Sequence, residues 1–110
     1  MKTQSSVGPG KYDLEQKKLK RAKLILSIYS MPEIIEKSLS NLKRWKANNV
    51  WCSAYTEWQK IMESGDQKTI RDAMISESER STRLRQSPPY VGLLSKQEVM
   101  MVNQDIINFK

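Results

Sequence analysis

The chain has no histidine, and it has a single cysteine, Cys52, among 110 residues. Without histidine, the Ser-His-Asp and Cys-His arrangements of nucleophilic catalysis are excluded, and so are the common zinc sites. The carboxylate pairs Glu77 with Glu79 and Asp66 with Asp72 lie in ordinary polar helical surroundings, which are typical of solvated helix surface rather than of acid–base chemistry. We therefore expect no enzymatic activity, no metal and no cofactor.

Disulfides and long apolar segments are also missing. One cysteine cannot form an internal disulfide, which is typical of a reducing, cytoplasmic setting. Because free cysteine is among the most buried residue types, we expect Cys52 to lie in the core beside Trp51 and Tyr55. No window reaches the roughly 18 to 20 apolar residues of a membrane span, and the first residues contain no apolar signal segment. We expect a cytoplasmic protein without membrane association.

Glycine and proline are scarce, at four residues each, and Gly8, Pro9 and Gly10 account for three of them. The glycines form neither a P-loop nor a dinucleotide-binding turn, so no small-molecule substrate is evident. A body poor in turn residues favours helices over many short strands. We predict a flexible N-terminal tail, residues 1–11, and one all-α domain, residues 12–110, built as a small bundle of about five or six helices.

The predicted helices are placed by their caps and apolar periodicity. The first, residues 12–29, has a basic half that we expect in water and an apolar half that we expect to be buried. The second begins at a capping box of Ser30 and Glu33 and carries one apolar stripe. A third runs from about residue 53 to Gly65, and Asp66 caps a short fourth helix. Another short helix lies within residues 77–86, and the last spans 96–109 behind a second capping box.

The stretch 42–62 contains all three tryptophans of the chain. Its rings would form either a base-stacking platform or part of the core. Trp45 falls on the apolar stripe of one predicted helix, Tyr55 and Trp58 are three residues apart on the next, and Trp51 lies in the connection. A short helical hairpin, residues 30–63, would bring these rings together inside it. We therefore predict that they form an aromatic-rich core.

Positive charge is concentrated in the first half of the chain. Residues 1–60 carry twelve Lys and Arg against five Asp and Glu, whereas residues 61–110 carry seven of each, so the net charge of +7 resides in the first half. A basic patch of this kind is expected to contact nucleic-acid phosphates, although a solvated helix end gives the same pattern. The candidate nucleic-acid-binding residues are Lys17, Lys18, Lys20, Arg21, Lys23, Lys37 and Arg44. The pair of short helices in residues 63–86 has the length of a helix-turn-helix but lacks its apolar spacing.

A second candidate surface follows the short Arg-rich helix. The Pro-Pro-Tyr segment would act as a docking loop for a protein partner, and the last helix has more apolar residues than the end helix of a small monomer needs. The candidate partner-binding residues are Arg85, Pro88, Pro89, Tyr90, Met100 and Ile107. The alternative is a rigid connector that packs Tyr90, Val91 and Leu93 against the core.

Two functions therefore stand side by side. The first is a small non-enzymatic, nucleic-acid-associated regulatory or accessory factor that contacts phosphates through its N-terminal basic helix. The alternative is a protein-binding module or inhibitor, of the antitoxin-like or phage and mobile-element type, that acts through the Pro-Pro-Tyr loop and the C-terminal helix. The partner is then nucleic acid, another protein, or a second copy of the chain.

Overall fold

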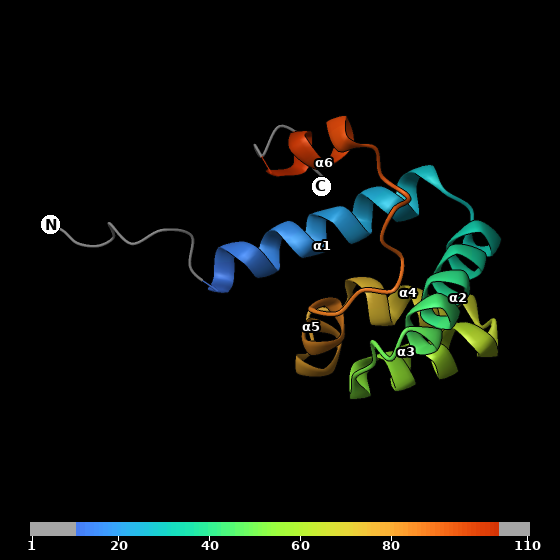
Figure 1. Cartoon of the computed structure of the whole chain (residues 1–110). Coiled ribbons are helices and arrows are strands. Elements are labelled where there is room, and N and C mark those ends of the chain that lie inside the picture. Colours follow the sequence, from blue (N-terminus) through green and yellow to red (C-terminus); the bar gives the residue numbers. More distant parts are fainter. Residues whose placement is uncertain (1–10, 104–110) are drawn as a thin grey trace, which may run out of the picture.

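The computed structural model describes residues 11–103, which form six helices and no strand (Figure 1). The helices are α1 (Lys11–Ile28), α2 (Met31–Ala47), α3 (Ser53–Ser64), α4 (Gln67–Ile75), α5 (Glu79–Arg85) and α6 (Lys96–Asn103). The prediction of an all-α helical bundle is confirmed. Lys11, expected in the tail, is the first residue of α1. The remainder of that tail and residues 104–109 of the predicted last helix lie outside the described residues.

Helix α1 runs through the bundle between two groups of elements. It contacts α6 on one side and α4 and α5 on another, and α2 and α3 form an antiparallel hairpin beside them (Figure 1). Helices α3, α4 and α5 pack against one another. The connecting loop, residues 86–95, leaves α5, passes α2 and crosses α1 near its C-terminal end before it enters α6 (Figure 1). This loop therefore brings the second half of the chain against the first two helices.

The predicted helix boundaries rest on local hydrogen bonds. At the start of α2 the Glu33 backbone N–H donates to Ser30 Oγ at 3.4 Å, and the Ser30 N–H donates to Glu33 Oε1 at 2.9 Å. The same reciprocal pair joins Ser95 and Glu98 ahead of α6, at 3.0 and 2.8 Å. Gly65 ends α3 with a left-handed φ of +67°. In each capping box the two partners are only three residues apart, and the Gly65 stop depends on a single residue, which is why the sequence predicts these boundaries well.

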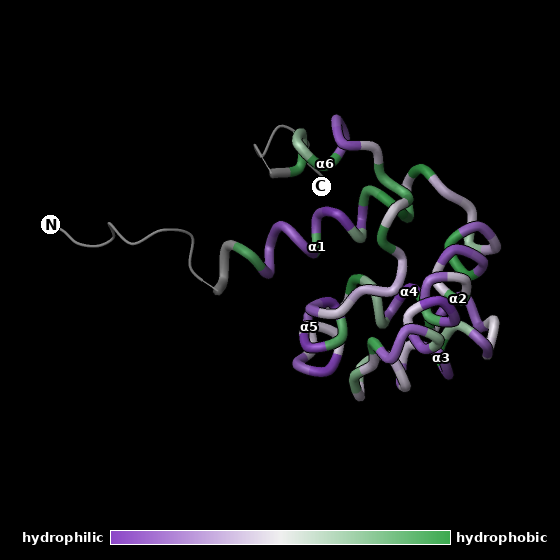
Figure 2. Tube along the Cα trace, viewed as in Figure 1, coloured by the Kyte–Doolittle hydropathy of each residue, from purple (hydrophilic) through white to green (hydrophobic). Residues whose placement is uncertain are grey.

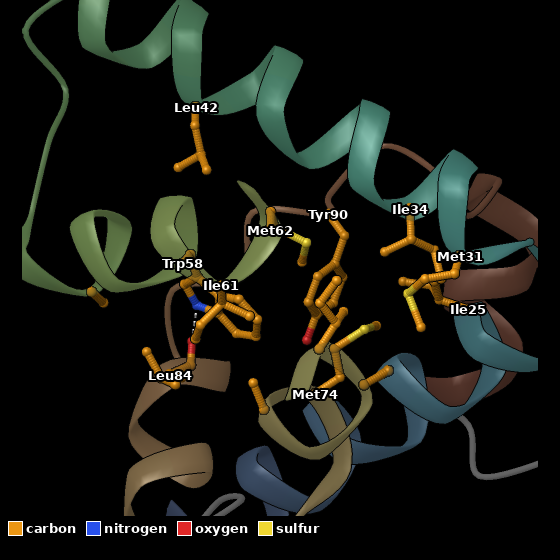
Figure 3. Packing of buried hydrophobic residues seen from close by; sticks show 14 residues of the cluster. Ile25, Met31, Ile34, Leu42, Trp58, Ile61, Met62, Met74, Leu84 and Tyr90 are labelled. Atoms are coloured by element: carbon orange, nitrogen blue, oxygen red, sulfur yellow. Dashed lines mark hydrogen bonds between the residues drawn. The ribbon is translucent and has the colours of Figure 1, made fainter. Parts of the chain in front are cut away.

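The core gathers around Trp58 and Tyr90 (Figure 3). Tyr90 lies between Trp58 and Met62 on one side and Ile34 on the other (Figure 3). The rings of Trp58 and Tyr90 meet edge to face at a centroid distance of 5.7 Å, and Trp58 Nε1 donates to the Leu84 carbonyl oxygen at 2.8 Å. Because the indole N–H has this partner, the largest side chain of the core is buried without an unsatisfied donor.

The basic half of α1 is not free in water, contrary to expectation. Leu19 and Ala22 in that half are buried, because α4, α5 and α6 all pack on this helix. The five cations between positions 17 and 23 are half-buried. Figure 2 shows a hydrophilic stretch in this half of α1. In the apolar half, Leu24 and Ile25 are buried whereas Ile28 is exposed. Burial in α1 is therefore centred on its middle.

Candidate functional site

The connecting loop is fixed to α2 by a buried asparagine. Asn41 is 1% exposed, and its Nδ2 donates to the carbonyl oxygens of Pro89 and Val91, each at 2.9 Å. Its Oδ1 accepts a hydrogen bond from Arg44 Nη2 at 3.0 Å. One side chain therefore satisfies two loop carbonyls and orients a cation at the same time. The sequence carries a weak signal for this role, because Asn41 lies at the edge of the apolar arc of α2, where a polar residue that becomes buried needs hydrogen-bond partners.

The Pro-Pro-Tyr segment faces the interior. Tyr90 is 4% exposed, Pro89 is fully buried, and burial raises the pKa of Tyr90 above its ordinary value. Val91 is 44% exposed, whereas Leu93 is half-buried. The structure therefore matches the rigid-connector interpretation for Tyr90 and Leu93 but not for Val91. Tyr90 and Pro89 do not present the exposed docking surface that the partner hypothesis requires of them.

Arg85, expected at a partner surface, lies inside the bundle. It is 4% exposed, and its Nη1 donates to the carbonyl oxygens of Met74 at 3.2 Å and Ser76 at 2.5 Å. Its Nη2 donates to Thr82 Oγ1 at 3.2 Å. Burial lowers the pKa of Arg85 from its ordinary value. These bonds join the end of α4 to α5, so the primary role of Arg85 is in the fold.

Four predicted cations gather around the connecting loop. Lys18 and Arg21 of α1 line a pocket together with Pro88, Val91 and Gly92 of the loop. On the α2 side, the Lys37 side chain lies across Gly92, where an added Cβ would stand 3.1 Å from Lys37 Cε. The fourth is Arg44, which reaches the loop through Asn41. We call Lys18, Arg21, Lys37 and Arg44 the loop-flanking cations.

The other three cations of α1 are not brought to this loop. Lys17, Lys20 and Lys23 are half-buried and do not line the pocket that contains Lys18 and Arg21. At 100° per residue they occupy a different arc of the helix. The predicted basic cluster is thus divided, and only part of it meets the cations of α2.

The aromatic stretch is only partly core. Trp58 is fully buried, but Trp45, Trp51 and Tyr55 are half-buried at the loop end of the hairpin. Trp45 stacks on Tyr55 at 4.9 Å, and Trp51 meets Tyr55 edge to face at 5.6 Å. Lys46 Nζ lies 5.4 Å from the centroid of Trp51. The core prediction therefore holds in full for one of these four rings.

The expectation for Cys52 is wrong, because the residue is exposed. Its backbone forms the N-cap of α3, with φ −146° and ψ 168°, and no side-chain hydrogen bond accompanies this cap. A position set by the local turn thus overrides the general tendency of cysteine to be buried.

The Arg-rich helix α5 faces α3. Arg83 Nη2 lies 2.8 Å and Arg80 Nε 3.6 Å from the two carboxylate oxygens of Glu57. All three side chains are at least one-third exposed, so these ion pairs contribute little to stability. They nevertheless offset part of the positive charge of the candidate helix-turn-helix.

The exposed apolar surface of α6 is limited to what can be described up to residue 103. Met100 is 56% exposed, in line with its candidate role, whereas Val102 is buried against the bundle. Ile107, the other partner-binding candidate of this helix, lies outside the described residues. The described part of α6 therefore presents one large exposed apolar side chain.

The described residues contain no group of His, Cys, Asp or Glu side chains that could hold a metal ion. Between residues 11 and 103, no helix combines the length and apolar character needed to cross a membrane. No protein-family model, curated protein or solved structure matches the chain. Function is therefore inferred from the site itself.

Proposed function

We propose that the chain is a non-enzymatic, nucleic-acid-associated regulatory or accessory protein of the cytoplasm, which contacts phosphates through the loop-flanking cations. The single observation that carries the proposal is the gathering of Lys18, Arg21, Lys37 and Arg44 around one fixed loop. Helices α1 and α2 supply them. The connecting loop, which lies between these cations, is held to α2 by two hydrogen bonds from Asn41.

Charge and rigidity both favour phosphate binding. The chain carries a net charge of +7, and each phosphate that a cation neutralises releases condensed counterions. Arg44 is oriented by Asn41, so less side-chain freedom is lost when its guanidinium meets a phosphate. Lys17, Lys20 and Lys23 would add contacts along α1 if the phosphate backbone follows that helix.

The proposal is tested by fluorescence anisotropy with labelled duplex DNA and labelled single-stranded RNA over a range of salt concentrations. The test variant carries Lys18→Gln, Arg21→Gln, Lys37→Gln and Arg44→Gln. We expect it to reduce the slope of log affinity against log salt by about 3 to 4, since each phosphate contact contributes about 1. Helicity measured by circular dichroism checks that the variant is folded.

A matched control removes the same number of charges elsewhere. Lys43, Lys60, Lys68 and Arg71 are exposed and lie away from the connecting loop. Their substitution by Gln should change the slope by no more than about 1. A third variant, Lys17→Gln with Lys20→Gln and Lys23→Gln, measures the share of the remaining cations of α1. Absence of binding at low salt, or equal losses in the test and control variants, would refute the proposal.

The second candidate is a protein-binding module that uses α6. Its support is the exposure of Met100 of α6 and Val91 of the connecting loop, at 56% and 44%. Sedimentation of the full chain, with and without Met100→Asp, tests self-association through this surface. A monomer at all concentrations, unchanged by the substitution, would remove the homodimer.

A further inference from the structure

A pocket of about 260 Å³ opens between α1, the connecting loop and α6. Its apolar lining includes Ile25 of α1, Leu94 of the loop and Val99 of α6. Its charged lining consists of the cations Lys18, Arg21 and Arg85, and Tyr90 lines it as well. Among residues 11–103 no carboxylate lines it, so the part of the pocket that the structure describes combines apolar walls with positive charge.

Arg85 gives this pocket a buried donor. Three of its hydrogen bonds go to Met74, Ser76 and Thr82, through Nη1 and Nη2. A guanidinium has five N–H groups, so Nε–H and one Nη2–H have no acceptor among the described residues. No described carboxylate forms an ion pair with Arg85 either. The carboxylates of Glu77 and Glu15 act on Arg85 electrostatically without forming an ion pair with it, so an anion placed directly beside the guanidinium would add a close opposite charge.

We propose that this pocket binds a small amphipathic carboxylate. The carboxylate group lies among Lys18, Arg21 and Arg85, where a guanidinium can hold both oxygens. The apolar body of the ligand packs against Ile25, Leu94 and Val99. The volume is slightly below the range of about 300 to 1,000 Å³ that is usual for drug-sized ligands, so the fitting class is a monocarboxylic acid of about six to ten carbons.

The inference goes beyond the proposed function, and its test contains no nucleic acid. Octanoate is the probe, and its affinity for the full chain is measured by saturation-transfer NMR titration. Acetate keeps the carboxylate without the apolar body, octanamide keeps the body without the charge, and octylammonium reverses the charge. We expect octanoate to bind at least tenfold more tightly than each of the three.

Two variants test whether octanoate binds in this pocket. Lys18→Gln removes one lining cation and should weaken octanoate binding severalfold, whereas Lys43→Gln, outside the pocket, should leave it unchanged. Val99→Phe fills the apolar part and should reduce binding at least tenfold. On the unmodified protein, intermolecular NOEs from the octanoate chain to the methyl groups of Ile25, Leu94 and Val99 give the same information without any substitution.

Equal binding of octanoate and octanamide would overturn the inference, because the cations would then play no part. So would NOEs to other methyl groups, or no binding at millimolar concentration. Octanoate binding in a protein that binds neither DNA nor RNA would retain this pocket and refute only the nucleic-acid proposal. Nucleic-acid binding without octanoate binding would do the reverse.

Discussion

Two buried polar residues of α2 show how different the consequences of burial are for single side chains. Asn41 makes three hydrogen bonds, two of them to the connecting loop. Ser38, one turn earlier and equally buried, has an Oγ without a hydrogen-bond partner among the described residues. A buried polar group stabilises a fold only when it is paired, and otherwise costs the free energy of its lost hydration.

Opposite effects are therefore expected from alanine at these two positions. Asn41→Ala leaves the buried carbonyl oxygen of Pro89 and the part-buried carbonyl oxygen of Val91 without this donor, and should lower the free energy of unfolding by about 2 kcal/mol. Ser38→Ala removes an unpaired hydroxyl and should raise it by up to about 1 kcal/mol. Urea denaturation measures both, with Ser40→Ala on the exposed face of α2 as a control. A loss at Ser38 as large as that at Asn41 would contradict this account.

Glycine is required at two positions with positive φ. Gly65 has φ +67° and nothing within 4 Å of an added Cβ, so alanine there should cost about 1 kcal/mol for the backbone alone. Gly92 has φ +91°, and its Cβ would stand 3.1 Å from Lys37 Cε. We expect Gly92→Ala to cost more than Gly65→Ala in thermal denaturation.

The loss of stability expected for Gly92→Ala has two parts, one from the backbone conformation and one from the contact with Lys37. In a Lys37→Ala background the clash is removed, and the cost of Gly92→Ala should fall towards that of Gly65→Ala. An unchanged cost in this double-mutant cycle would mean that Lys37 does not lie against the loop.

At the scale of elements, the helix caps predicted from the sequence agree with the structure. The capping boxes before α2 and α6, the Asp66 cap of α4 and the Gly65 stop of α3 are all present. Each is decided by residues within about four positions, so no tertiary information is needed. The burial of α1 differs from the prediction, because three helices that are distant in sequence decide which of its residues are covered.

The caps also give α2 and α4 a dependence on pH. The hydrogen bond from the Ser30 backbone lowers the pKa of Glu33 below its ordinary value, and the bonds from the Thr69 side chain and backbone lower the pKa of Asp66 in the same way. Groups with a lowered pKa in the folded state contribute stability above their ordinary pKa, and lose it as the pH falls through the folded value. The double variant Glu33→Gln with Asp66→Asn should therefore show a smaller loss of melting temperature between about pH 5 and about pH 3.

The control for this measurement is Glu36→Gln with Asp72→Asn, which removes two exposed carboxylates from the same helices without touching a cap. Its melting temperature should keep the pH dependence of the unmodified chain. If the cap variant and the control behave alike, the depressed pKa values do not contribute to acid sensitivity.

At the scale of the whole molecule, the arrangement of the surfaces was not predictable from the sequence. The basic cluster and the Pro-Pro-Tyr segment were two separate candidates, whereas the structure brings Lys18 and Lys37 to the same loop as Pro88. The contacts that do this join residues about 50 positions apart, such as Asn41 with Val91. No local pattern encodes such a pairing, and the burial of Arg85 and Tyr90 depends on the same long-range packing.

The connecting loop and α6 are also attached to the end of α1. Tyr29 Oη donates to the Leu93 carbonyl oxygen at 2.5 Å, across 64 positions. Because α6 packs chiefly on α1, we expect Tyr29→Phe to increase amide hydrogen exchange in α6 and in residues 92–95 while α2 to α5 stay protected. Exchange followed by mass spectrometry on the full chain measures this. Uniformly faster exchange would mean that the bond supports the whole bundle instead.

The Asn41 hydrogen bonds have a consequence for the order of folding. The bond to Pro89 spans 48 positions, and α3, α4 and α5 all lie within the ring that it closes. Closing a ring of this length costs entropy before any contact is gained, although the cost grows only with the logarithm of the length. Once α3, α4 and α5 have packed on one another, the effective ring is much shorter. Formation of that three-helix unit should therefore precede docking of the loop on α2, and the loop-flanking cations would come together last.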